Sequence, residues 1–155
     1  MGEKIYKKCL CAEFEAGIVE FYKNEDKLHQ VLEYMENQPF FLSKLELEGR
    51  KTIINNVEKK YFHSGKNLNY WCKNNLRWFP FQASTLYINN FSNKSFGERD
   101  LLLGCVISLL ERHTGFTIEL ANIGKERFHN KLFSEIENYC VKTIQEQLKI
   151  SKINI

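Results

Sequence analysis

The sequence predicts an α+β fold: a single domain with a mostly antiparallel sheet and packed helices, including a long C-terminal helix. Three observations lead to this class. Apolar residues alternate with polar ones in several short stretches, as they do in half-buried strands. In other stretches apolar residues recur at helical spacing and define one face. No repeat, low-complexity segment or linker divides residues 1–155, so we expect one domain with helices packed on a sheet.

The N-terminal part predicts one strand followed by one helix. Apolar and polar side chains alternate over residues 10–15, which predicts a half-buried strand. The phase of this alternation changes at Gly17, which indicates a bulge or a tight turn. Asp26 is the expected N-cap of a helix that ends near Asn37, shortly before Pro39. The apolar face of this helix comprises Leu28, Val31, Leu32 and Met35.

The middle of the chain predicts a β-hairpin and a later strand. Over residues 41–57, apolar side chains alternate with polar ones until Gly49, which supplies the expected turn. Residues 58–83 show no regular period, and we expect a short helix around residues 68–76 followed by a loop through Pro80. Alternation resumes over residues 85–90 and predicts another strand.

The second half predicts two helices with a strand between them. The first helix is expected over residues 93–113, capped by its first Asn or Ser and ended by Gly115 in a left-handed conformation. Alternation over residues 116–121 predicts a strand, and Gly124 then turns the chain into a long helix. The apolar stripe of that helix comprises Phe128, Leu132, Ile136, Cys140, Ile144 and Leu148.

Composition points to a folded protein of a reducing compartment. The hydrophobic share is 43% and the charged share 26%, both ordinary for a globular domain. The five cysteines are an odd number, and the first ten residues lack the apolar core of a signal peptide, so we expect a cytoplasmic protein with free thiols. The apolar run over residues 101–110 is far shorter than the ~20 residues of a membrane span, which favours a buried helix. Abundant Lys, Asn and Ile suit a bacterial gene.

No complete catalytic, cofactor or metal motif is present. The glycines stand singly, so the chain has neither a P-loop nor a dinucleotide fingerprint, and no cofactor is expected. Cys9 and Cys11 are two residues apart, but a structural zinc site needs a second short-spaced pair, so no metal is expected. Catalytic residues that are far apart in sequence have no fixed spacing, so a motif search does not detect them. Cys72 is the nucleophile candidate, because a cation as close as Lys73 lowers a thiol pKa.

Charge is distributed unevenly along the chain. Residues 1–49 contain 6 Lys or Arg against 10 Asp or Glu, whereas residues 50–77 contain 7 against 1. The remaining residues are nearly balanced, and the net charge is +3. The basic segment overlaps a stretch rich in aromatic residues. The candidate partner-binding residues from this overlap are Lys59, Lys60, Tyr70, Trp71, Lys73, Arg77 and Trp78.

The favoured function is that of a non-catalytic protein-binding domain. We expect a small cytosolic inhibitor or immunity-type protein, which neutralises a protein toxin or nuclease by occluding it. Trp, Tyr and Arg are the residue types enriched at interface hot spots, and segments of opposite charge suit electrostatic docking. An inhibitor of a basic nuclease is expected to be acidic, whereas this chain is slightly basic. Residues 13–48 would then have to supply the complementary charge, or the toxin would have to be acidic near its site.

Three alternatives stay open at the level of sequence. Residues 50–81 have the composition of a nucleic-acid-binding segment, in which each stacked base contributes roughly 1–3 kcal/mol. An enzyme with a Cys-based site is a second alternative. The third alternative is that the aromatic rings fill the core and have no binding role; these rings are Trp71, Phe79 and Phe81. Sequence alone does not decide whether these rings face inwards or outwards.

Overall fold

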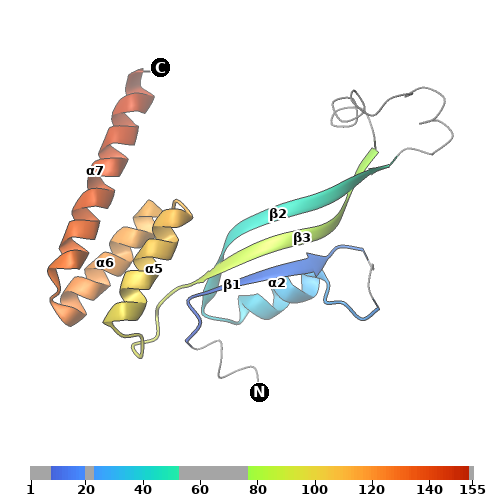
Figure 1. Ribbon diagram of the computed structural model, residues 1–155, viewed down its shortest axis with the longest axis horizontal. Helices are drawn as coiled ribbons and strands as arrows, with labels where there is room; N and C mark the ends of the chain where they lie inside the picture. The colour runs from blue at the N-terminus through green and yellow to red at the C-terminus, as the bar shows by residue number, and fades with distance from the viewer. Residues whose placement is uncertain (1–7, 20–22, 53–76, 154–155) are drawn as a thin grey trace. The chain divides into compact units, whose positions relative to one another are not determined.

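A computed structural model describes residues 8–19, 23–52 and 77–153 of the protein (Figure 1). In chain order the elements are β1 (Cys11–Gly17), α2 (Leu28–Glu36), β2 (Phe40–Thr52), β3 (Arg77–Asn89), α5 (Glu98–Leu110), α6 (Thr114–Phe128) and α7 (Lys131–Ile153). The three strands form an antiparallel sheet of order β1-β3-β2. The predicted α+β class, with its antiparallel sheet and long C-terminal helix, is therefore confirmed.

Backbone hydrogen bonds show how β3 pairs with the N-terminal strand. The N–H of Asn89 donates to the carbonyl oxygen of Leu10 at 2.9 Å, and the N–H of Ile18 donates to that of Phe81 at 2.8 Å. The residue number rises in one strand as it falls in the other, which is the register of an antiparallel pair. The predicted strand over residues 10–15 is thus present as β1, which begins one residue later and ends two residues later.

Two predictions for the middle of the chain are wrong at their boundaries. β2 continues through Gly49 to Thr52, so the expected hairpin turn does not occur at that glycine. An extended backbone accepts glycine, although glycine weakens a strand. β3 begins at Arg77 and includes Pro80, where a loop was expected. The remaining part of the predicted hairpin and aperiodic segment, residues 53–76, lies outside the described residues.

Packing divides the chain into two compact units. The described residues of the first, the helical unit, are 8–12, 37–43 and 87–153. The described residues of the second, the sheet unit, are 13–19, 23–36, 44–52 and 77–86. The helical unit thus contains α5, α6 and α7, and the sheet unit contains α2 and most of the strands.

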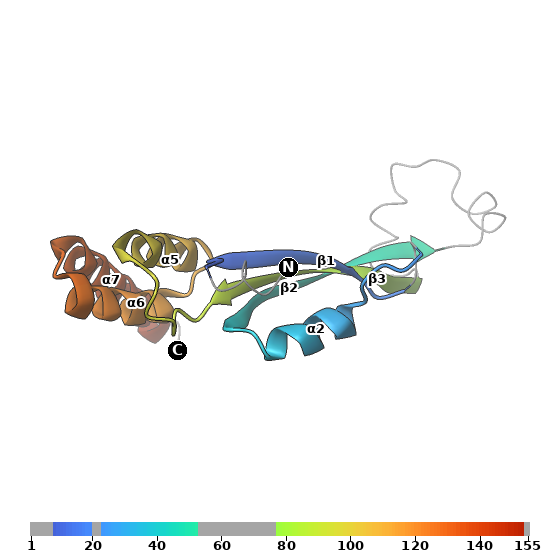
Figure 2. The same cartoon turned by 90° about the horizontal axis from the view of Figure 1, so that it is seen from below.

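In the sheet unit, α2 runs along one face of the strands (Figure 2). Ala16, Ala83 and Thr85 are buried on the strands, and Met35 is buried on α2. The Thr85 hydroxyl donates to the carbonyl oxygen of Phe14 at 3.3 Å, which satisfies a buried polar group.

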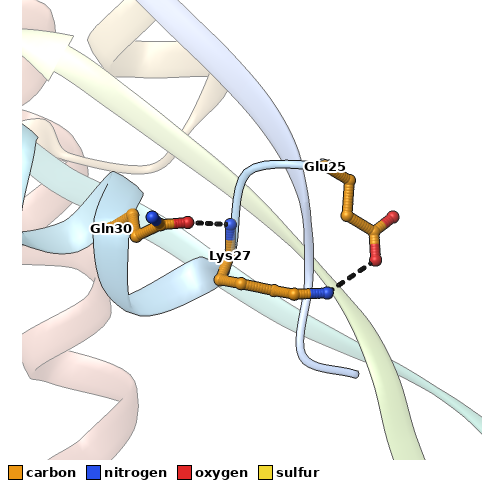
Figure 3. A network of polar contacts seen from close by, with 3 residues as sticks. All are labelled: Glu25, Lys27 and Gln30. Carbon is orange, nitrogen blue, oxygen red and sulfur yellow. Dashed lines mark hydrogen bonds and ion pairs between the residues drawn. The ribbon is translucent and has the colours of Figure 1, made fainter. Parts of the chain in front are cut away.

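The N-terminus of α2 is capped differently from the prediction. The helix begins at Leu28, so Lys27 rather than Asp26 precedes it. The Gln30 side chain accepts a hydrogen bond from the Lys27 N–H at 2.8 Å, which is the return half of a capping box (Figure 3). The Lys27 ammonium also pairs with the Glu25 carboxylate at 2.8 Å. This polar network fixes the chain where it enters the helix.

The helical unit is built around α6, which packs against both α5 and α7. Its buried core comprises Ile88, Phe91, Phe96, Leu101, Cys105, Leu120, Ala121 and Phe133. Two glycines let aromatic rings approach a helix backbone closely. A Cβ atom at Gly104 would overlap the ring of Phe91, and a Cβ atom at Gly124 would overlap the ring of Phe133. The positions of both rings therefore require glycine at residues 104 and 124.

The strand predicted over residues 116–121 is wrong, because these residues belong to α6. Gly115 and Gly124, which were expected to end a helix and to form a turn, also lie inside α6. The buried residues of this helix are Thr117, Leu120, Ala121 and Gly124. This set has helical spacing, but three of its members are small or polar, so a search for large apolar residues does not detect it.

Left-handed residues mark the junctions between the three helices. Arg112, with φ of 62°, follows the end of α5, and His129, with φ of 53°, follows α6. The helix predicted from residue 93 begins instead at Glu98, where the Asp100 carboxylate accepts from the Gly97 N–H at 2.8 Å.

Within the described ranges, no helix is long and apolar enough to cross a membrane.

Candidate protein-binding surface

The partner-binding residues predicted from sequence are not tested by the structure. Five of them lie outside the described residues: Lys59, Lys60, Tyr70, Trp71 and Lys73. Arg77 and Trp78 begin β3, but their side chains are outside the described part as well. The nucleophile candidate Cys72 and the alternative core position of Trp71 are likewise undescribed. These predictions stay open, and the candidate surface below comes from other residues.

From Leu101 to Leu110, α5 carries no charged residue on any side, although only one of its sides is buried. Leu101, Gly104, Cys105 and Ser108 face the core of the helical unit. Leu103, Val106 and Leu110 are 40%, 51% and 76% exposed. An α-helix advances about 100° per residue, so these three residues share one face, opposite the buried set. We call Leu103, Val106 and Leu110 the α5 outer stripe.

An arginine lies at each end of the α5 outer stripe, and the one at the C-terminal end directly follows Glu111. Arg99 is exposed four residues before Leu103, on the same side of the helix, and Arg112 is exposed two residues after Leu110. Neither arginine forms an ion pair with any residue in the described ranges. The acidic residues of the first helical turn are already engaged: Asp100 accepts from the Gly97 N–H, and Glu98 accepts from the Asn130 amide.

α7 also exposes apolar side chains, but they are mixed with charges. Leu132 and Tyr139, 44% and 61% exposed, lie two turns apart on one face. Exposed Glu135, Lys142 and Glu146 lie beside that face, and the last two approach each other at 3.9 Å. Interspersed apolar residues of this kind are ordinary on a protein surface. The α5 outer stripe differs because α5 carries no charge between Asp100 and Glu111.

The sheet unit exposes carboxylates that the sequence places in the acidic N-terminal third. Glu13 and Glu15 are exposed on β1, and Glu46 and Glu48 are exposed on β2. Among these, Glu46 pairs with Lys44 at 3.0 Å, and Glu13 accepts from the Ser84 hydroxyl at 3.2 Å. The carboxylates expected to supply negative charge are thus at the surface of this unit.

One hydrogen-bonded pair has the composition of a nucleophile and its base. The Ser43 hydroxyl lies 2.7 Å from Nε2 of His113, although the residues are 70 positions apart in sequence. The ring of Phe41 contacts His113 edge-on, with centroids 5.6 Å apart. Activation of a serine also requires a third group that orients the histidine. No carboxylate in the described ranges forms a hydrogen bond or an ion pair with the His113 side chain, so the pair has the form of a structural hydrogen bond. Sequence spacing gave no signal for it.

The four cysteines of the described ranges are free thiols, as the sequence predicts for them. Cys105 and Cys140 are fully buried in the helical unit. Burial, together with the nearby Cys140, raises the pKa of the Cys105 thiol to about 11. Burial also raises the pKa of Cys140. Both groups are therefore protonated at neutral pH, and packing rather than chemistry accounts for them. The described ranges contain no cluster of three or more potential metal ligands.

We expect Cys105 and Cys140 to react with a thiol probe at pH 7 at least about tenfold more slowly than the half-buried Cys9 and Cys11, because the thiolate is the reactive form and needs access. Labelling followed by peptide mass spectrometry measures each site separately. Denaturant should remove the difference. Equal native-state rates at all four sites would contradict the burial of Cys105 and Cys140.

No protein-family model matches this chain, and neither the curated proteins nor the solved structures include a match to it. The fold and the α5 outer stripe are therefore the basis for a functional proposal.

Proposed function

We propose that this protein is a non-catalytic protein-binding domain of the inhibitor type, which neutralises a protein toxin or enzyme by occluding it. The observation that carries the proposal is the α5 outer stripe. A helix that is apolar on all sides is normally buried on all sides, whereas α5 is buried on one side only. A partner would cover the other side.

The energetics favour a protein partner for the α5 outer stripe. Complete burial of a Leu or Val side chain contributes roughly 1.5–3 kcal/mol, so three clustered side chains represent a substantial binding contribution. A single helix face is convex, whereas small-molecule sites are concave cavities. Helix faces of this kind are recognised by grooves or helices of other proteins, through apolar residues at helical spacing.

The test is capture of a partner from an extract of the native host, with Val106→Asp as the disruptive variant and Leu132→Asp as the control. Both substitutions place a charge at an apolar helix residue of similar exposure. The unchanged chain and Leu132→Asp should capture one protein in stoichiometric amount, and the captured protein should lose its activity in the complex. Val106→Asp should capture at least about tenfold less, because a charge at the centre of an interface opposes desolvation.

Two results would contradict the proposal. One is capture that is equal for the unchanged chain and Val106→Asp. The other is the absence of any stoichiometric protein, with nucleic acid retained at low salt and released at high salt. Circular dichroism and thermal unfolding of each variant would establish that Val106→Asp is folded, so that loss of capture reports the surface and not the fold.

A further inference from the structure

We propose that the occupant of the α5 outer stripe is an acidic amphipathic helix of the partner protein. This inference rests on the proposed function, and it adds the chemistry of the partner. Two features of α5 support it: the spacing of the exposed apolar residues and the charges at the two ends. The same charges make a second copy of this chain a poor occupant.

The spacing of the α5 outer stripe fits a helix. Leu103, Val106 and Leu110 are separated by three and four residues, which is the alternation that places side chains into the holes of a facing helix. From Leu103 to Leu110 the axial rise is about 10 Å, or two helical turns. Two helices crossing at a shallow angle stay in contact over such a length.

The charges at the ends favour an acidic partner. Arg99 lies in the first turn of α5, where the helix macrodipole favours acidic side chains and a cation is unfavourable. Its position is therefore not explained by the stability of α5. Arg112 stands at the other end, and both arginines lack an ion-pair partner within the described ranges. Carboxylates of a bound helix would pair with both cations, which favours an acidic partner over a basic one.

A second copy of this chain is a poor occupant for the same reason. Antiparallel two-fold pairing centred between Val106 and Ile107 sets Leu103 of one copy beside Leu110 of the other, and brings Arg99 toward the other Arg112. Parallel two-fold pairing sets each arginine beside its own equivalent. A two-fold interface is self-complementary, so like charges meet in both arrangements. Juxtaposed like charges suppress association.

The probes for this inference are two synthetic helical peptides of about three heptads with leucine at the a and d positions. One peptide carries glutamate at the flanking positions, and the other carries lysine there. Binding to the full chain is measured by fluorescence anisotropy. We expect the glutamate peptide to bind at least about tenfold more tightly than the lysine peptide, with an affinity that falls as salt is raised.

Three variants assign the binding to the α5 outer stripe. Val106→Asp should abolish binding of the glutamate peptide, and Leu132→Asp should leave it unchanged. Arg99→Glu should shift the preference between the peptides at least about tenfold toward lysine, because it reverses one of the two charges. Arg99 is exposed, so this substitution should leave the fold intact.

The inference is overturned by equal affinity for the two peptides, by failure of both to bind, or by a preference that Arg99→Glu does not move. It is also overturned if the chain dimerises in sedimentation experiments and Val106→Asp abolishes the dimer, since the occupant is then a second copy. If neither peptide binds but capture of a host protein depends on Val106, the occupant is not an acidic helix. The proposed function is then still supported. If the glutamate peptide binds but no host protein is captured, the proposed function is contradicted. The preference of the α5 outer stripe for an acidic helix is then still supported.

Discussion

Replacing Phe133 with alanine should lower the free energy of unfolding by about 3–5 kcal/mol, the range typical of a buried aromatic side chain. Phe133 is fully buried in the core of the helical unit, and its ring lies directly on the backbone of Gly124. Removal of the ring leaves a cavity between α6 and α7 that the helices can close only in part. Domains of this size are stable by only about 5–15 kcal/mol, so the loss is a large fraction of the total stability. It is the largest effect on stability that we expect.

Urea unfolding followed by circular dichroism measures this loss, and the neighbouring residue provides the control. Leu132 is 44% exposed, so Leu132→Ala should change the free energy of unfolding by less than about 1 kcal/mol. Phe133→Leu retains part of the buried volume and should fall between the two. A Phe133→Ala variant as stable as Leu132→Ala would show that the ring does not fill the core of the helical unit.

Replacing Gly104 with valine should destabilise the protein by about 1–3 kcal/mol through overpacking. A side chain at this position would meet the ring of Phe91, which is itself fixed. Phe91 has a left-handed backbone, with φ of 54°, and its N–H donates to the Asn89 side chain at 2.8 Å. A ring held by its own backbone cannot easily move aside, so the valine would displace α5.

Gly115→Ala is the matched control for Gly104→Val. A Cβ atom at Gly115 has no heavy atom within 4 Å, so the substitution adds no clash. It should be neutral or stabilise the protein by up to about 1 kcal/mol, because alanine favours a helix over glycine. Thermal unfolding of both variants distinguishes overpacking from a general effect of glycine replacement. Equal effects of the two substitutions would contradict the contact between α5 and Phe91.

Sequence periodicity was reliable where one face of an element is apolar and the other is polar. β1 and the long C-terminal helix α7 satisfy this condition, and both were predicted. The predicted start of the long helix is wrong, because Phe128 is the last residue of α6 and α7 begins at Lys131. α6 does not satisfy it. Its buried face consists of Thr117, Leu120, Ala121 and Gly124, and the glycine is required by the ring of Phe133. A contact from another helix thus decides the structure there, and local sequence does not contain that contact.

The α5 outer stripe could not be predicted for a related physical reason. Residues 101–110 were expected to form a buried helix, because this apolar run is too short to span a membrane. Such a sequence has no polar face that would identify the side left in water. Exposure of Leu110 depends on which side the rest of the helical unit covers. The partner-binding residues predicted around Trp71 and Trp78 remain a prediction, because their side chains lie outside the described residues.

The two ring-on-glycine contacts of the helical unit also constrain how this sequence can change over generations. A larger residue at Gly104 or Gly124 becomes acceptable only when the facing aromatic residue shrinks. In related sequences each glycine should therefore covary with its partner, Phe91 or Phe133, while exposed positions such as Gln145 drift independently. Such paired changes would place Phe91 beside α5, and α6 beside α7, from an alignment alone.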